Sequence, residues 1–168
     1  MKHLKTLLTA AALIFGMSFM NAQSKVAHIN TQELVEAMPA MQTAKAELEK
    51  LAKTYDTDIQ TMATELQNKV KQYDAEASTK NDEENTKRMQ EVAGMEQSIR
   101  QYQGQAQQDL AKKQQELTEP IYKQVQEAII KVGKAQGFQY ILDSTIGQGV
   151  LLADGTDLLA DVKKELGF

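Results

Sequence analysis

The most regular feature of the chain is a stripe of apolar residues that begins at Met41. The stripe positions follow one another at steps of three or four residues: Met41, Ala44, Leu48, Leu51, Tyr55, Ile59, Met62, Leu66, Val70, Tyr73 and Ala77. This spacing matches the repeat of about 3.6 residues of an α-helix. Neither Gly nor Pro interrupts residues 40–93. The pattern therefore predicts one long helix with a single apolar face.

A second stripe follows after a short polar segment. Residues 78–82 read Ser-Thr-Lys-Asn-Asp and contain no stripe position, so we predict a turn there, with Asn81 or Asp82 capping the next helix. The second stripe comprises Met89, Val92, Met95, Ile99, Tyr102, Ala106, Leu110, Leu117, Ile121, Val125, Ile129 and Val132. Two stripes on either side of a turn predict an antiparallel helical hairpin over residues 41–119.

The two arms of this hairpin differ in composition. Gly94 and Gly104 interrupt the second arm, and residues 101–115 contain seven Gln, so we expect this arm to be the more flexible. Pro39 and Pro120 lie at equal distances from the predicted turn. Because proline starts, stops or bends helices, we interpret these two residues as hinges at the base of both arms. Coincidence is the alternative explanation of their symmetry.

Charged residues on the polar faces stand four apart, with Glu before Lys or Arg. Such pairs each stabilise a helix by a few tenths of a kcal/mol. We predict five of them: Glu49/Lys53, Glu65/Lys69, Glu83/Lys87, Glu84/Arg88 and Glu96/Arg100.

The segments outside the hairpin predict a small body with three short strands. We expect strands at residues 25–29, 138–143 and 150–153, a turn at Gly147–Gly149, a helix capped by Thr31, and a final helix from about Leu158. Residues 23–40 and 120–168 then form this body, and the fold class is α+β, mostly α. Short strands with exposed edges favour pairing with other subunits. We assign the oligomerisation surface to Val26, Ile29, Tyr140, Ile141, Leu142, Val150, Leu151 and Leu152.

Residues 1–22 have the pattern of a secretory signal peptide. Lys2 and Lys5 precede an apolar run from Leu7 to Met20, which ends shortly before Ala22. The run is shorter than the roughly 20 residues that a membrane-spanning helix needs. We predict cleavage after Ala22 and delivery to the periplasm, with a retained membrane anchor as the alternative.

Composition and charge exclude several classes of function. The 168 residues contain no Cys, two His, 19 basic and 23 acidic side chains, for a net charge of −4. These numbers argue against a thiolate metal site, a thiol nucleophile and nonspecific nucleic-acid binding. We interpret His28 as structural and the Gly147–Gly149 segment as a hairpin turn. We predict no catalytic residue, no cofactor and no metal, and therefore no enzyme.

The candidate binding surface is the part of the stripe nearest the turn. It comprises Met62, Leu66, Val70, Met89, Val92, Met95 and Ile99. Methionine is flexible and polarizable, so it suits surfaces that must fit many partners. The alternative is that these residues only form the seam between the arms. Both interpretations hold together if the arms separate transiently.

The order of these parts resembles the Skp/OmpH family of periplasmic chaperones across residues 23–168. The resemblance depends on the first strand from Val26 to Asn30, on Pro39, on Pro120-Ile121-Tyr122, on residues 137–143 (GFQYILD), and on the closing helix after Asp157. It implies a homotrimer shaped like a jellyfish, whose hairpins surround a cavity. It also implies that unfolded outer-membrane β-barrel proteins are held there, without ATP, until they are inserted into the membrane.

The charge of the hairpin departs from that resemblance. Residues 41–118 carry 11 basic and 14 acidic side chains, a net charge of −3, whereas well-known members of the family have basic arms. Binding of lipopolysaccharide, which is anionic, is therefore not expected, and any steering of partners favours basic ones. The alternative function is a structural coiled-coil spacer or adaptor of the cell envelope.

Overall fold

The computed structural model describes residues 24–168, so the predicted signal peptide lies outside the described residues. The described chain divides into two units, one of residues 24–34 with 125–168 and one of residues 35–124. We call them the sheet unit and the hairpin unit. Within residues 24–168, no helix combines the length and apolarity needed to cross a membrane.

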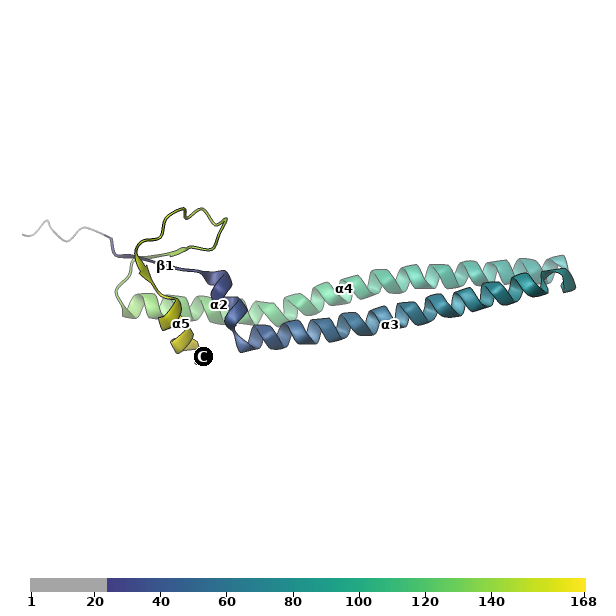
Figure 1. Cartoon of the computed structure of the whole chain (residues 1–168), viewed down its shortest axis with the longest axis horizontal. Helices are drawn as coiled ribbons and strands as arrows, with labels where there is room; N and C mark the ends of the chain where they lie inside the picture. Colours follow the sequence, from purple (N-terminus) through teal and green to yellow (C-terminus); the bar gives the residue numbers. More distant parts are fainter. Residues whose placement is uncertain (1–23) are drawn as a thin grey trace, which may run out of the picture. The chain divides into compact units, whose positions relative to one another are not determined.

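The hairpin unit contains two long helices that lie side by side (Figure 1). Helix α3 spans Pro39–Glu76, and helix α4 spans Asp82–Ala135 and contributes its residues up to 124 to this unit. The short 3-10 helix η2 (Ala77–Thr79) joins them. The 38 residues of α3 correspond to a rod of roughly 57 Å at 1.5 Å per residue. The prediction of a long antiparallel hairpin is confirmed.

The two prolines differ in their local structure. Pro39 occupies the first turn of α3, where the missing N–H has no intrahelical partner to lose. Pro120 lies inside α4, and the helix continues past it to Ala135. Pro39 therefore starts a helix, as one form of the expectation requires. Pro120 neither starts nor ends its helix. Their role as hinges stays a prediction.

The sheet unit contains a parallel sheet of three short strands in the order β2-β1-β3. The strands are β1 (Val26–Ile29), β2 (Tyr140–Asp143) and β3 (Thr156–Asp157). Residues 26–29 of β1 align with residues 140–143 of β2. Parallel strands need a long connection. Between β1 and β2, that connection includes α2 (Thr31–Ala37) and the whole hairpin, so the sheet unites the two ends of the described chain.

The core of the sheet unit contains mostly apolar side chains. Alternation along β1 buries Ala27 and Ile29, because successive side chains of a strand point to opposite faces. The other buried side chains among the described residues of this unit are Leu34, Val125, Ala128, Val132, Leu158, Val162 and Thr145. Gly133 of α4 permits close approach of β2, since a Cβ there would lie 2.2 Å from Ile141 Cδ1. Helix α5 (Leu159–Leu166) contributes Val162 to this core.

The third strand lies later in the sequence than predicted. Residues 150–153 form no strand, and the two-residue strand β3 follows at Thr156–Asp157. The Gly147–Gly149 segment is also no hairpin turn, because β2 and β3 lie on opposite sides of β1 instead of pairing with each other. The reason is the central position of β1, whose two edges take one partner each.

The segment from Ile146 to Ala153 exposes its apolar side chains. Ile146, Leu151 and Leu152 are 97%, 101% and 85% exposed. The assignment of Val150, Leu151 and Leu152 to a strand was wrong, because residues 150–153 have no strand structure. Their predicted role in subunit contact stays a prediction. Large exposed apolar side chains that lie close together commonly mark an interface.

Asn30 caps the helix after β1, where Thr31 was predicted. Its Oδ1 accepts a hydrogen bond of 3.0 Å from the Glu33 N–H, and α2 already begins at Thr31. The Thr31 hydroxyl instead donates to Asp143 Oδ2 at 2.5 Å. Thr145 donates to the other carboxylate oxygen through its N–H (2.9 Å) and its hydroxyl (2.7 Å). These bonds join the end of β1 to the end of β2.

We expect this Asp143 cluster to make the sheet unit sensitive to acid. Burial by itself raises the pKa of Asp143, but hydrogen bonds from Thr145 and Thr31 outweigh it and lower the pKa below 3.8. The stabilisation is therefore fully present above the ordinary pKa and is lost as the pH falls through the lowered one. Thermal unfolding measured from about pH 6 down to about pH 2 should show a smaller acid loss in Asp143→Asn than in the wild type. Equal acid sensitivity of both proteins would contradict this assignment.

Candidate functional site

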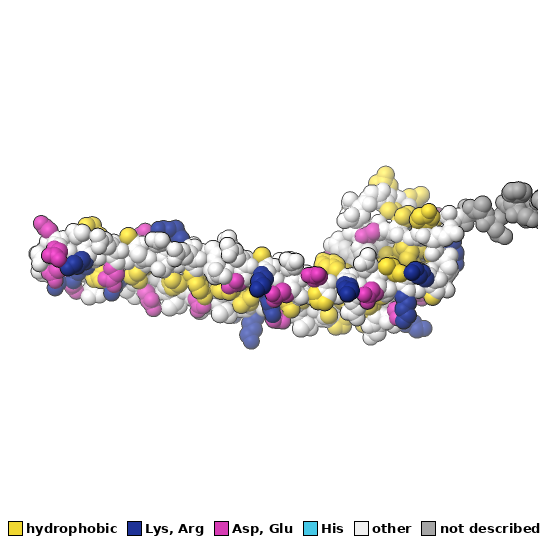
Figure 2. Space-filling model, turned by 180° about the vertical axis from the view of Figure 1, so that it is seen from behind, with side chains coloured by type: hydrophobic (Ala, Val, Ile, Leu, Met, Phe, Trp, Pro, Cys, Tyr) yellow, Lys and Arg dark blue, Asp and Glu magenta, His cyan; other side chains and the backbone are white. Residues whose placement is uncertain are grey.

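The apolar seam of the hairpin is only partly covered. Buried residues of the hairpin unit occur at Val35, Met38, Met41, Ala44, Ala106 and Ile121. No side chain in residues 45–105 is buried. Two helices alone cover only one side of each stripe, so the flanks of the seam stay open to solvent. On the face drawn in Figure 2, hydrophobic side chains reach the surface along the hairpin, between Asp and Glu side chains.

The predicted binding residues all lie along this seam. Half-buried positions are occupied by Met62, Leu66, Val70, Val92, Met95 and Ile99. Met89 is 66% exposed. The structure therefore brings the predicted residues onto one pair of facing helices. Their contact with a partner stays a proposal.

Side chains of the turn join the ends of α3 and α4. Asn81 caps α4 by accepting a 2.8 Å hydrogen bond from the Glu84 N–H at its Oδ1. Asn85 reaches back across the turn and donates 3.0 Å from its Nδ2 to the Ala77 carbonyl oxygen. The loop between the helices is thus held by side chains from the first turn of α4.

Arg88 of α4 contacts α3 next to the turn. Its Nη2 lies 2.5 Å from Glu76 Oε2, and its guanidinium carbon lies 4.6 Å from the centre of the Tyr73 ring. Hydrogen bonds from Gln72 and then from Arg88 lower the pKa of Glu76. The Arg88 Nη1 atom is buried and has no hydrogen-bond partner among the described residues. Arg88 therefore pairs with Glu76 through one guanidinium nitrogen, while the other nitrogen has no bond among the described residues.

Glu91 of α4 joins the two helices slightly further from the turn. It lies 2.8 Å from the Lys69 ammonium and accepts a hydrogen bond from the Tyr73 hydroxyl. The Lys69 bond and then the Tyr73 bond lower the pKa of Glu91, and the Glu91 bond raises the pKa of Lys69. Both partners are partly exposed, so the pair contributes mainly to the alignment of the helices.

The middle of the hairpin carries a reciprocal pair of tyrosine–aspartate bonds. The Tyr55 hydroxyl donates to Asp109 at 2.9 Å, and the Tyr102 hydroxyl donates to Asp58 at 2.6 Å. The two rings contact each other edge to face, with centroids 5.7 Å apart. Since each tyrosine lies on one helix and its aspartate on the other, a shift of either helix would break both bonds.

We expect this arrangement to be visible in the titration of Tyr102. The hydrogen bond to Asp58 and then the partial burial of the ring raise the pKa of Tyr102 from 10.0 to about 12. A raised pKa means that the stabilisation is present below pH 10 and is lost as the pH rises to about 12. NMR of isotope-labelled tyrosine should show a lower pKa in Asp58→Asn. The control Asp56→Asn, at an exposed position without an ion pair among the described residues, should leave the pKa unchanged, and a shift there would contradict the assignment.

Two of the predicted ion pairs within one helix are replaced by pairs across the hairpin. Lys69 pairs with Glu91 instead of Glu65, and Arg88 pairs with Glu76 instead of Glu84. Pairs within α4 do form at Glu83/Lys87 and Glu96/Arg100, at 2.7 and 3.6 Å. A charged side chain near the seam lies about as close to the opposite helix as to the next turn of its own helix. Long side chains such as Lys69 and Arg88 can therefore pair in either direction.

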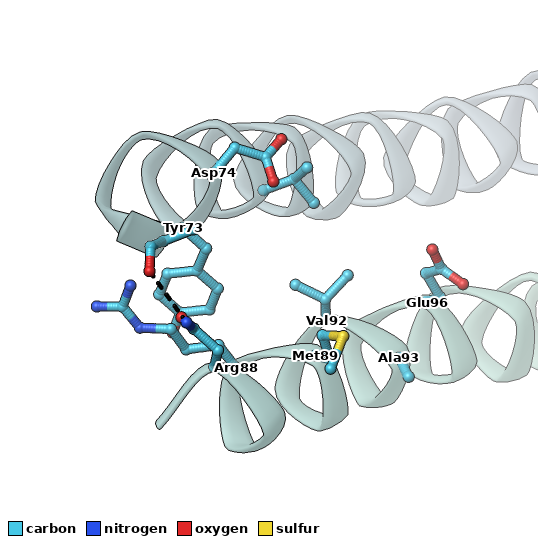
Figure 3. A pocket seen from close by; sticks show the side chains of 10 residues that line it. Tyr73, Asp74, Arg88, Met89, Val92, Ala93 and Glu96 are labelled. Atoms are coloured by element: carbon cyan, nitrogen blue, oxygen red, sulfur yellow. Dashed lines mark hydrogen bonds between the residues drawn. The ribbon is translucent and has the colours of Figure 1, made fainter. Parts of the chain in front are cut away.

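Two grooves flank the seam near the turn. The first has a volume of about 530 Å³, and Val70 is among its lining residues. Met89 and Val92 form its apolar floor (Figure 3). The second encloses about 440 Å³ and is lined by Met62, Glu65, Glu91, Gly94, Met95, Ser98 and Ile99. The two grooves share no lining residue, so they are separate recesses.

The acidic residues at the walls of these grooves were not among the predicted site residues. Asp74 and Glu96 line the first groove, and Glu65 lines the second. A signal for two of them exists in the sequence, since Asp74 follows Val70 by four residues and Glu96 follows Val92 by four. Residues four apart share a helix face, so each carboxylate lies beside a stripe position.

The grooves combine apolar side chains with carboxylates along two facing helices. Within residues 24–168, no group of three or more His, Asp or Glu side chains has the arrangement of a metal site. Within the hairpin unit, the tyrosine, lysine and carboxylate groups with shifted pKa values form hydrogen bonds to partners in the same unit, and those bonds are the largest cause of each shift.

A small parallel sheet in one unit and a long antiparallel hairpin in the other define the structural class. A solved structure from Caulobacter crescentus CB15, described as a candidate outer membrane chaperone (OmpH-like), shares this fold with a TM-score of 0.77. The two chains are 18% identical, and the match covers 86% of this chain and 85% of the other. A comparison with curated proteins gives no match. The family model "Outer membrane protein (OmpH-like)" matches residues 25–166, so the chain belongs to the OmpH-like family.

Proposed function

We propose that this protein is a holding chaperone that binds unfolded outer-membrane β-barrel proteins and prevents their aggregation without ATP. The observation that carries the proposal is the long hairpin whose apolar seam has no buried side chain over residues 45–105. Membership of the OmpH-like family supports it, as does the shared fold with a candidate outer membrane chaperone.

Many weak contacts suit this task better than one tight site. An unfolded barrel protein presents apolar residues in alternation, at no single fixed geometry. Half-exposed Met, Val, Leu and Ile side chains spaced along two helices offer matching weak contacts. Each buried CH₂ group contributes about 0.8 kcal/mol, so several shallow contacts hold a chain that can still be released.

The assembly that we propose is a homotrimer built on the sheet unit. The edges of the sheet are the four-residue strand β2 and the two-residue strand β3. Exposed strand edges and the apolar residues Ile146, Leu151 and Leu152 are features that favour burial against further subunits. Three copies then place three hairpins around a shared client.

The proposed location is the periplasm. Residues 1–22 carry the pattern of a cleaved signal peptide, and the clients must pass between the two membranes before insertion. Lipopolysaccharide is not among the proposed ligands, since residues 41–118 carry a net charge of −3.

Light scattering during dilution of a denatured barrel protein tests the function. We expect one trimer per client to suppress most of the aggregation, in buffer without nucleotide. A folded globular protein of similar charge serves as the control in place of the chaperone. Unchanged aggregation at this ratio would contradict the proposal.

A structural spacer or adaptor of the cell envelope is the second candidate function. The observation in its favour is the set of bonds across the hairpin, Tyr55–Asp109, Tyr102–Asp58 and Arg88–Glu76, which hold the helices in one register. A pull-down from envelope extract distinguishes the two functions. A spacer captures one folded partner, whereas a holding chaperone captures many unfolded ones.

A further inference from the structure

The groove nearest the turn combines an apolar floor with carboxylates on both walls. Asp74 projects from α3 and Glu96 from α4, with Met89 and Val92 between them (Figure 3). The volume of about 530 Å³ lies within the range of about 300–1,000 Å³ typical of ligand pockets. Met89 is 66% exposed, so an incoming side chain can reach the floor without rearrangement of the hairpin.

The charges that line this groove leave it acidic. Asp74 has no ion-pair partner among the described residues, and the partner of Glu96 is Arg100 at 3.6 Å, with both side chains more than half exposed. Arg88 is the one cation in the lining, and Glu76 neutralises it at 2.5 Å. A ligand in the groove therefore meets two accessible negative charges and one positive charge that is already paired.

The second groove repeats this combination with different residues. Its floor contains Met62, Met95 and Ile99, and its charged lining residues are Glu65 and Glu91. Glu91 is bound to Lys69, while Glu65 has no ion pair among the described residues. Two separate grooves thus place an available carboxylate beside methionine and aliphatic side chains.

We propose that these grooves bind extended segments of unfolded protein in which an apolar side chain lies next to Lys or Arg. The apolar side chain contacts the floor, and the neighbouring ammonium or guanidinium group pairs with Asp74 and Glu96 in one groove or with Glu65 in the other. Charge complementarity selects this occupant over an acidic segment, since like charges oppose each other across a groove. The inference rests on the proposed holding function and specifies its client segments.

Three unstructured peptides of equal length test this selectivity. They contain the same leucines and differ only in whether Lys, Gln or Glu stands beside each one. Fluorescence anisotropy with the intact protein should show the Lys peptide binding about fivefold more tightly than the Gln peptide, and the Glu peptide binding most weakly. Added salt should narrow these differences because it screens exposed charges. Equal affinities for all three peptides would overturn the inference.

Matched variants locate the effect. Asp74→Asn combined with Glu96→Gln removes two charges from the first groove and should reduce the preference for the Lys peptide. The control, Asp56→Asn combined with Glu119→Gln, removes two exposed charges elsewhere in the hairpin unit and should retain the preference. An equal loss in both double variants would show a nonspecific charge effect and overturn the proposed site.

A third variant distinguishes the contribution of the apolar floor to binding from that of the carboxylates on the walls. Met89→Ser should weaken binding of all three peptides while leaving their order of affinity intact, because it shortens the floor and leaves both carboxylates in place. If Met89→Ser instead changes the sedimentation mass and no peptide binds the wild type, a second copy of the chain occupies the groove and the inference is wrong.

Different results would contradict the holding function and the preference for basic segments. Suppressed aggregation of a barrel protein together with equal binding of the Lys and Glu peptides refutes the selectivity and leaves the holding function standing. Absence of both suppression and peptide binding refutes the holding function itself.

Discussion

Replacing Leu151 and Leu152 with aspartate is expected to convert the proposed trimer into monomers. Both side chains are almost fully exposed in the single chain, at 101% and 85%. Residues 144–153 contain no charged side chain, which is unusual for a solvent-exposed segment of this length. Apolar side chains exposed to water are unfavourable. We therefore expect another subunit to cover Leu151 and Leu152 in the assembly.

The expected size of this effect follows from the transfer of side chains out of water. Burying a leucine stabilises an interface by about 1.5–3 kcal/mol, and placing an unpaired carboxylate there costs several kcal/mol instead. Because each subunit contributes both positions, the loss is repeated at every interface. Sedimentation of the double variant should therefore give the mass of one chain.

The matched control is Gln107→Asp with Gln108→Asp. These neighbouring residues are exposed on α4, and the change adds the same two charges. We expect the control to sediment as the trimer. A wild type that is monomeric, or a Leu151/Leu152 double variant that remains trimeric, would contradict the proposed interface.

Shortening Leu158 to alanine is expected to destabilise the sheet unit by about 2–5 kcal/mol. Leu158 has no exposed surface, and its N–H donates a 3.0 Å hydrogen bond to the carbonyl oxygen of His28 in β1. It precedes α5, whose Val162 is also fully buried. Alanine leaves a cavity there, and close-packed neighbours relax only partly into it.

Denaturant unfolding followed by circular dichroism measures this loss. Ile130→Ala is the control, because Ile130 lies in the same unit and is 44% exposed. We expect the control to lose less than half as much stability as Leu158→Ala. Equal losses in the two variants would mean that Leu158 does not belong to the central core.

The helices were predictable because their signal is local. A stripe with a period near 3.6 residues determines which face of α3 and α4 turns inward, whatever lies elsewhere in the chain. The cap at Asn81 is equally local, since an Asn side chain bonds to the N–H of a residue three positions later. The same signal misplaced the cap of α2 by one residue, because Asn30 and Thr31 are both good capping residues.

The sheet was predictable only in part. Residues 26–29 and 140–143 read as strands from their composition, but residues 150–153 have an equally apolar sequence and form none. Strand formation depends on a partner at the right register, and β1 takes Thr156–Asp157 at its second edge. No local pattern marks those two polar residues as a strand.

The sequence by itself determined that two amphipathic helices lie antiparallel and which residues form their seam, since periodicity and turn chemistry act over a few residues. Only the tertiary structure decided which side chains meet across that seam, such as Lys69 with Glu91 and Tyr102 with Asp58. It also decided the parallel order of the strands and the position of Asp74 and Glu96 on opposite walls of one groove. These arrangements join residues far apart in the chain. Their contacts stabilise the protein only after folding has brought those residues together.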